Sequence, residues 1–81
     1  MKGGDFVIKN KYDFLKYLIA HMSKDTYRFV DEGNNLLNLV DAYTQQEYLE
    51  DLEYDGFIKT CVGYIQINPE TILAMKKLYN I

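Results

Sequence analysis

The chain has 81 residues, of which 48% are hydrophobic and 26% are charged, and its formal net charge is −3. A composition this apolar argues against intrinsic disorder, and the length fits one domain that buries roughly 60% of its unfolded surface. The single cysteine, Cys61, excludes an intramolecular disulfide, and no cysteines and histidines have the spacing of a zinc site. No stretch reaches the ~20 apolar residues of a membrane span. We therefore expect a cytoplasmic protein with no metal, no cofactor and no membrane contact.

The composition also bears on the source of the chain. Asn, Ile, Lys and Tyr together make up 29 residues, whereas Ala, Arg, Pro and Gly together make up 10. This bias is typical of an AT-rich genome and suggests a phage, viral or prokaryotic protein. It carries no information about mechanism.

The N-terminal third predicts an extension, a helix and a strand. Residues 1–10 form the extension, and the helix covers residues 11–23, with Asn10 as its cap and Asp13 near the positive end of its dipole. Residues 26–30, TYRFV, favour a short strand, and the sequence DEGNN then breaks the chain. At 100° per residue, the inward face of the helix comprises Tyr12, Leu15, Leu18, Ile19 and Met22, with Phe14 widening it.

Two further helices are predicted in the middle of the chain. The first covers residues 35–42, with Leu36, Leu39, Val40 and Tyr43 on its inward side. The second begins at a capping box formed by Thr44 and Glu47 and ends at Gly56, which is free to adopt a positive φ. Its inward residues are Tyr48, Leu49 and Leu52.

The C-terminal third predicts a hairpin and a last helix. The segments FIKTCV and YIQIN alternate with a period of two around Gly63, which is typical of a tight two-stranded hairpin. Asn68 is suited to cap the last helix, with Pro69 at its first position. Ile72, Met75, Leu78 and Tyr79 form the inward stripe of that helix.

These elements predict a single α+β domain over residues 1–81, in the order helix, strand, helix, helix, β-hairpin, helix. The order over residues 11–79 resembles the winged-helix (winged helix-turn-helix) superfamily, as does the step from Leu52 through Gly56 to Phe57 and Ile58, where a recognition helix would run into the wing. The resemblance implies a transcription regulator whose third helix reads DNA. The predicted wing, however, is only one or two residues long, whereas a wing that reads the minor groove is usually longer and basic.

The charge distribution conflicts with DNA reading by that helix. No Lys or Arg lies between Arg28 and Lys59, and residues 29–58 carry eight carboxylates, so their net charge is −8, against +3 for residues 1–28 and +2 for residues 59–81. DNA binding draws most of its affinity from Lys and Arg that neutralise phosphates. Insertion of this helix into the major groove is therefore not expected.

The outward face of the helix that begins at Thr44 is the first candidate site. An exposed aromatic ring such as Tyr54 has no role in the core, and tyrosine is common at the centres of protein interfaces. The face suits a basic patch on a protein partner, conceivably a nucleic-acid-binding protein; the alternative is a solvated face that keeps the domain soluble. The candidate partner-binding residues are Gln46, Glu47, Glu50, Glu53 and Tyr54.

The basic N-terminal surface is the second candidate, for a regulator that binds DNA through a surface other than its third helix. These cations are also explained as ordinary solvated side chains. Leu37 and Leu73 lie off the main apolar stripes, so either the core extends around their helices or they contact a second copy, as in a homodimer through the last helix. The candidate nucleic-acid-binding residues are Lys9, Lys11, Lys16, Lys24 and Arg28.

Nothing in the sequence indicates an enzyme. His21 has no second base or nucleophile placed to work with it, and Cys61 has no basic neighbour in sequence, so both are interpreted as structural. The sequence DEGNN at residues 31–35 has acids and amides but lacks the ligand spacing of an EF-hand, so we interpret it as a turn.

Overall fold

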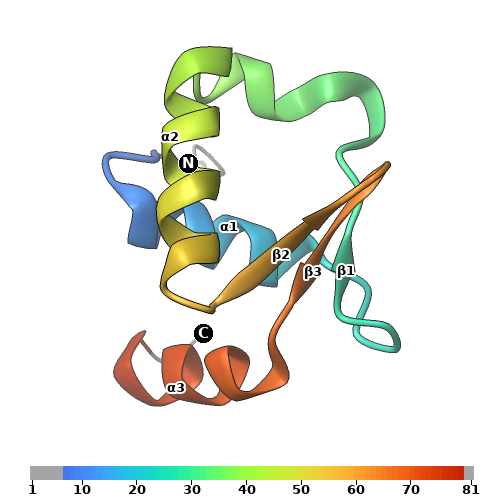
Figure 1. The fold of residues 1–81 in the computed structure, drawn as a ribbon, viewed down its shortest axis with the longest axis vertical. Helices are drawn as coiled ribbons and strands as arrows, with labels where there is room; N and C mark the ends of the chain where they lie inside the picture. Colours follow the sequence, from blue (N-terminus) through green and yellow to red (C-terminus); the bar gives the residue numbers. More distant parts are fainter. Residues whose placement is uncertain (1–6, 80–81) are drawn as a thin grey trace.

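The computed structural model describes residues 7–79, except for the side chains of Asn34, Leu78 and Tyr79. It shows a compact α+β fold with three α-helices, one 3₁₀ helix and a three-stranded antiparallel sheet, in the predicted order (Figure 1). The fold class predicted from the sequence is therefore confirmed. Most of the predicted N-terminal extension, residues 1–6, lies outside the described residues.

The first helix, α1, covers Lys11–His21 and is capped as predicted. The Asn10 side-chain oxygen accepts hydrogen bonds from the Tyr12 and Asp13 amides at 3.0 and 2.9 Å. The helix ends two residues earlier than expected, and beyond it the Ser23 amide donates to the Arg28 carbonyl. The buried face of α1 includes Phe14 and Tyr17, whereas Tyr12 is exposed, so the prediction that Tyr12 faces inward is wrong.

The first strand, β1, is shorter than predicted and covers Arg28–Phe29. Tyr27 has φ 56°, a left-handed conformation that no extended strand includes, so the strand cannot begin before Arg28. The pairing partner of β1 is the central strand β3, Tyr64–Ile67, with Phe29 opposite Ile65. The third strand, β2, Ile58–Cys61, pairs with the other edge of β3, so the strand order is β1-β3-β2.

The middle of the chain contains two corrections. The segment expected as an α-helix over residues 35–42 is a 3₁₀ helix, η1, Glu32–Asn38, and the next helix, α2, already begins at Ala42 and covers Ala42–Tyr54. Asp41, rather than Thr44, caps α2: its carboxylate accepts from the Thr44 amide at 3.0 Å and from the Thr44 hydroxyl at 2.7 Å. The prediction of a capping box formed by Thr44 and Glu47 is therefore wrong, because Thr44 lies inside the first turn of α2 and donates hydrogen bonds to the cap residue.

The turns after α2 are as predicted. Gly56 has φ +82°, and the Gly56 and Phe57 amides donate to the Glu53 and Leu52 carbonyls, which is the Schellman arrangement of a helix end. β2 and β3 form the predicted tight hairpin through Val62 and Gly63. Asn68 both caps α3, Pro69–Tyr79, through the Glu70 amide and donates from its side chain to the Gly56 carbonyl.

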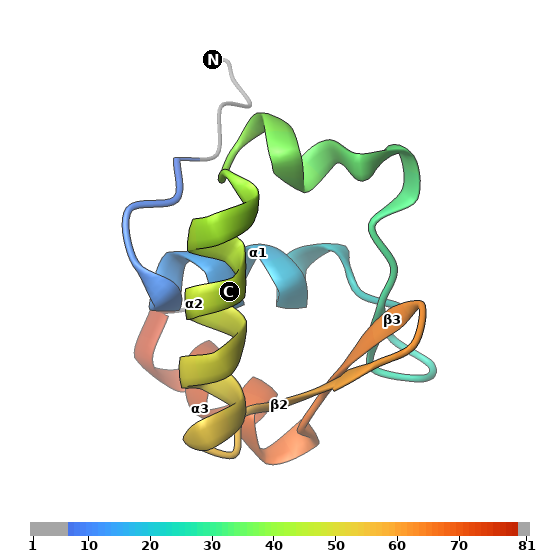
Figure 2. The same cartoon turned by 45° about the horizontal axis from the view of Figure 1, so that its top comes forward.

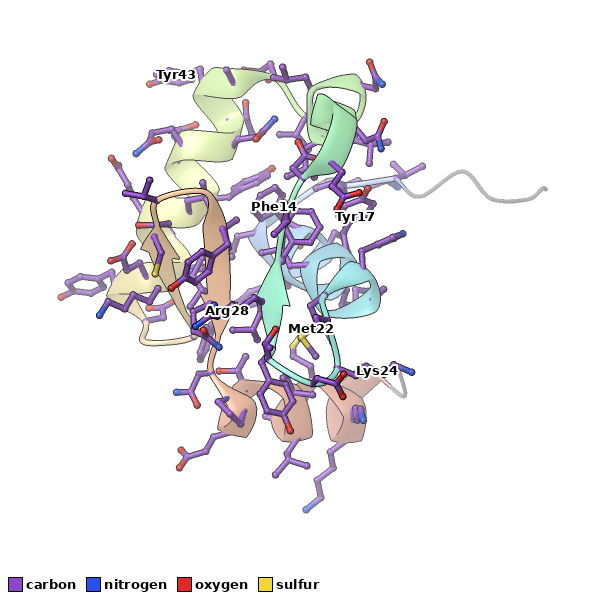
Figure 3. The ribbon with its side chains drawn as sticks, turned by 90° about the vertical axis from the view of Figure 1, so that its right-hand side faces the viewer. Phe14, Tyr17, Met22, Lys24, Arg28 and Tyr43 are labelled. Atoms are coloured by element: carbon purple, nitrogen blue, oxygen red, sulfur yellow. The ribbon has the colours of Figure 1, made fainter. Side chains whose placement is uncertain are left out.

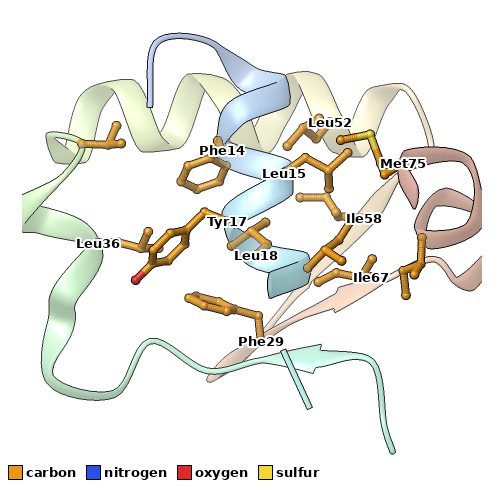
Figure 4. Packing of buried hydrophobic residues seen from close by; sticks show 13 residues of the cluster. Phe14, Leu15, Tyr17, Leu18, Phe29, Leu36, Leu52, Ile58, Ile67 and Met75 are labelled. Carbon is orange, nitrogen blue, oxygen red and sulfur yellow. The ribbon is translucent and has the colours of Figure 1, made fainter. Parts of the chain in front are cut away.

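The core lies between α1, α2, the sheet and α3 (Figure 4). α1 runs behind α2 and contacts both α2 and β1, while α3 lies across the end of the hairpin opposite its tip (Figures 1 and 2). Of the residues predicted to face inward, Leu39 and Tyr43 are exposed, and so are the off-stripe residues Leu37 and Leu73. The side chains of Leu78 and Tyr79 lie outside the described part of the chain. The fully buried side chains of largest volume are those of Phe14, Leu15, Leu18, Leu52 and Ile67.

Candidate functional site

The outward face of α2 carries two aromatic rings and two carboxylates in one line. Steps of four, three and four residues separate Tyr43, Glu47, Glu50 and Tyr54, so all four share one face of the helix. Tyr43 is 74% exposed and Tyr54 is 91% exposed, and both carboxylates between them are exposed as well. We call these four residues the α2 ridge.

Tyr43 is the residue of the ridge that sequence reasoning missed. The sequence predicted Tyr43 on the inward side of an earlier helix. Asp41 is instead the N-cap residue of α2, so the helix begins at Ala42 and Tyr43 lies in its first turn. Leu49 and Leu52 then hold the opposite face of α2 against the core, which turns Tyr43 outward. The sequence does contain a signal that could have identified Tyr43 as a ridge residue. Tyr43 and Tyr54 are eleven residues apart, which is close to three helical turns, so they share one face of a helix.

Three of the five predicted partner-binding residues, Gln46, Glu50 and Glu53, already have side-chain hydrogen bonds within the domain. The Gln46 side-chain amide donates to a Glu50 carboxylate oxygen at 3.0 Å and so orients that carboxylate along the helix. A Glu53 carboxylate oxygen accepts from the Thr60 hydroxyl at 2.6 Å and, more weakly, from the Thr60 amide at 3.4 Å. Glu53 therefore ties α2 to β2 and lies beside the ridge, not on it.

Asp55, at the C-terminal end of α2, has a cationic partner, whereas the carboxylates of the ridge have none among the described residues. Lys11 Nζ lies 3.1 Å from Asp55 Oδ2, and this hydrogen bond raises the pKa of the lysine. Within the described residues, neither Glu47 nor Glu50 has a Lys, Arg or His partner within 4.0 Å. A partner that supplies cations there gains electrostatic attraction without first breaking an ion pair.

The structure separates the five basic residues of the second candidate site. Lys11 pairs with Asp55, and Lys16 Nζ lies 3.4 Å from Asp13 Oδ1. The guanidinium of Arg28 lies 4.5 Å from the centre of the Tyr64 ring, and its Nε donates to Gln66. Lys9 precedes α1, and Lys24 lies in the turn after it, next to α3. These side chains do not form one basic surface.

The residues considered for catalysis or metal binding are His21, Cys61 and those of residues 31–35. The His21 ring stacks on Tyr17 with ring centres 4.2 Å apart, and burial, followed by the charge of Asp31, raises the pKa of Tyr17. Cys61 is half-buried in β2. The Asp31 carboxylate accepts from the Leu36 amide at the start of η1. Residues 32–35, which the sequence predicted as a turn, belong to this 3₁₀ helix, so that prediction is wrong.

Residues 7–79 contain neither a metal-binding cluster nor a membrane-spanning helix. No group of three His, Cys, Asp or Glu side chains in that part of the chain could hold a metal ion. None of the helices there has the length and apolar character needed to cross a bilayer.

Comparisons with protein-family models, curated proteins and solved structures gave no match. Function is therefore inferred from the geometry of the α2 ridge and of the surfaces around it.

Proposed function

We propose that this chain is a non-enzymatic, cytoplasmic regulatory module that binds a protein partner through the α2 ridge. The observation that carries this proposal is Tyr54, a ring that is 91% exposed and in line with two carboxylates that lack an ion-pair partner among the described residues. A ring this exposed contributes little to the fold, and tyrosine is among the residues that contribute most to binding at protein interfaces. Gln46, which orients Glu50, belongs to the same surface.

The ridge specifies the chemistry of the partner. A rise of about 1.5 Å per residue places Tyr43 and Tyr54 about 16 Å apart along the axis of α2. The partner therefore offers two apolar slots at that separation, with Lys or Arg side chains between them for Glu47 and Glu50. Surfaces that bind nucleic acid have such cations, so the module would compete with nucleic acid for its partner.

The resemblance to the winged-helix superfamily remains a proposal, and it suggests the alternative of a DNA-binding transcription regulator. The order of the elements and the position of β3 between β1 and β2 support the resemblance. DNA binding needs clustered cations, however, whereas Lys11 and Lys16 each pair with a carboxylate and Lys24 lies at the opposite end of α1 from Lys11. The arrangement of charges therefore favours a protein partner.

Affinity capture with matched variants tests the ridge. Proteins are captured from source cells with the wild-type protein, with a Glu47→Lys/Glu50→Lys/Tyr54→Ser variant and with a Glu32→Lys/Glu70→Lys control variant, which makes the same change in net charge elsewhere. Quantitative mass spectrometry is the readout. We expect a basic partner that the ridge variant fails to capture and the control variant retains. A partner retained equally by both variants would contradict the proposal.

Titration of labelled random duplex DNA separates the two functions. For a protein-binding module, we expect no change in anisotropy at low salt. Binding that weakens steeply as salt rises, and that is reduced by a Lys24→Glu/Arg28→Glu variant, would select the DNA-binding regulator.

A further inference from the structure

A second surface, opposite in charge to the α2 ridge, lies between the end of α1 and α3. It is a groove of about 430 Å³. Ile19, Met22, Tyr27 and Ile72 form its apolar wall, and Lys24 and Lys76 lie on its rim. Figure 3 shows Met22 and Lys24 in the turn beside α3, at the opposite end of the molecule from Tyr43. We call it the α1–α3 groove.

Tyr27 contributes its ring to this groove from a strained backbone. Its φ is 56°, and among the described residues it is the one residue other than glycine with a positive φ. A left-handed conformation is unfavourable for an L-residue with a bulky side chain, and Gly, Asn or Asp is the usual occupant. Strain of this kind is concentrated at functional sites. The neighbouring backbone holds Tyr27 in place, since its amide donates to the Ser23 carbonyl and its carbonyl accepts from the Ile67 amide, both at 2.8 Å.

The charge of the groove is one-sided. No acidic residue lines it, and neither Lys24 nor Lys76 has a carboxylate within 4.0 Å among the described residues. Leu73 lies three residues before Lys76 on the same side of α3 and is 69% exposed, so the apolar surface continues from the groove across the helix. A small molecule confined to the groove would leave Leu73 uncovered, whereas a peptide segment can cover both.

We propose that the α1–α3 groove binds a segment of a partner protein that has one aromatic or long aliphatic side chain flanked by carboxylates. The apolar side chain fills the groove against Tyr27, Met22 and Ile72. The carboxylates pair with the ammonium groups of Lys24 and Lys76. Because these groups are positively charged, the groove binds an acidic segment more tightly than a neutral or basic one. This site does not depend on the α2 ridge, so the protein has two partner-binding surfaces.

A defined peptide tests the groove. The probe is a fluorescein-labelled helical peptide with one tryptophan flanked on the same face by glutamates, and binding to the full chain is measured by anisotropy at low and high salt. We expect saturable binding that weakens as salt rises. One control peptide has lysine for each glutamate, and a second has serine for the tryptophan. Equal binding of either control would overturn the proposal.

Charge reversal at the rim is the first protein variant. We expect Lys24→Glu/Lys76→Glu to weaken binding of the glutamate peptide by about tenfold, because each exposed ion pair contributes up to ~1 kcal/mol. The matched control is Lys59→Glu/Lys77→Glu, which makes the same change in net charge elsewhere. An equal loss of affinity in both variants would show that only net charge matters, which would also overturn the proposal.

Substitution of Tyr27 distinguishes a binding role from a structural one. Asn tolerates the left-handed backbone but removes the ring, so Tyr27→Asn is expected to weaken peptide binding by about tenfold or more. Tyr27→Phe keeps the ring and is expected to restore affinity to within about threefold of the wild type. If both variants bind like the wild type while remaining folded, the ring is not part of the site and the proposal fails.

Amide chemical shifts locate the peptide on the wild-type protein. We expect changes at residues 19–27 and 72–76 and none on the α2 ridge. Changes confined to α2 would overturn the proposal. Sedimentation of the protein alone tests the competing occupant: salt-sensitive self-association that is abolished both by Lys24→Glu/Lys76→Glu and by Glu47→Lys/Glu50→Lys would assign the groove to a second copy of this chain.

Discussion

The α2 ridge and the α1–α3 groove differ in shape, in charge and in their relation to the core. The ridge is the outward side of a helix whose opposite side holds Leu52 in the core, so its side chains extend into solvent. The groove is concave, and its wall includes the buried core residues Ile19 and Ile72. The ridge carries carboxylates and the groove carries lysines, and Tyr43, at one end of the ridge, lies at the opposite end of the molecule from Met22 and Lys24 (Figure 3).

This difference bears on how a domain of 81 residues could combine the two proposed binding surfaces with a stable core. Residues of the ridge can change without altering the packing beneath them, because the helix is held by its inward face. The groove shares residues with the core and includes the left-handed Tyr27, so changes there act on the fold as well. Binding and stability are therefore separable on the ridge and coupled in the groove.

The largest expected effect comes from comparing the two sides of α2. Leu52→Ala should lower the free energy of unfolding by about 2–5 kcal/mol, because the side chain is fully buried and its removal leaves a cavity. Tyr54→Ala should change it by no more than about 0.5 kcal/mol. Urea unfolding followed by circular dichroism measures both. A loss above 1 kcal/mol for Tyr54→Ala would mean that the ridge is part of the structural framework.

A smaller effect marks the edge of the ridge. Glu53→Ala removes the acceptor for the Thr60 hydroxyl and should lower the free energy of unfolding by about 0.5–1 kcal/mol. The Glu50 carboxylate accepts a hydrogen bond from Gln46 on the same helix and does not link α2 to another element. Glu50→Ala should therefore have less than half of the effect of Glu53→Ala. Both losses are measured by urea unfolding. Equal losses would place Glu50 and Glu53 in the same structural role, and Glu50 would then no longer be a free binding group.

The smallest expected effect concerns pH and the start of α2. The hydrogen bond from the Thr44 hydroxyl, followed by that from the Thr44 amide, lowers the pKa of Asp41. A carboxyl whose pKa is lower in the folded state contributes stability above its unfolded pKa of about 3.9, and this contribution is lost as the pH falls through the folded-state pKa. The Asp41→Asn variant should therefore be less stable than the wild type at neutral pH, with a difference that shrinks below about pH 4.

Urea unfolding at a series of pH values measures that difference. The matched background is Thr44→Val, which removes the hydroxyl donor but keeps the amide and a side chain of similar shape. In that background, the pH dependence of Asp41→Asn should be smaller. An unchanged pH dependence would show that the Thr44 hydroxyl is not the cause of the lowered pKa.

The local signals in the sequence predicted much of the fold. Asn10, Gly56 and Asn68 act where expected, because caps and left-handed turns depend on residues within four positions in the chain. The hairpin around Gly63 follows in the same way from alternation and a turn residue. The prediction of Thr44 as the cap was wrong because two possible cap residues lie three positions apart, and the carboxylate of Asp41 accepts from both Thr44 donors.

The candidate site was predicted in part. The acidic face of α2 and Tyr54 followed from charge and spacing, whereas Tyr43 was missed and Glu53 was assigned to the outward face although its carboxylate contacts Thr60. The α1–α3 groove could not be predicted, since its residues come from two segments that are about 50 positions apart in the chain. The sequence did flag Leu73, at the edge of that groove, as lying off its stripe.

By itself, the sequence determined the order of the elements, several of the turns between them and the strongly acidic middle of the chain, because these depend on neighbours along the backbone. Only the tertiary structure decided how α1 and α2 are turned about their axes. That rotation is set by the volumes that must fit between the helices and the sheet, and it turns Tyr17 inward and Tyr43 outward. The same packing brings Lys24 and Lys76 to one rim, which no local pattern specifies.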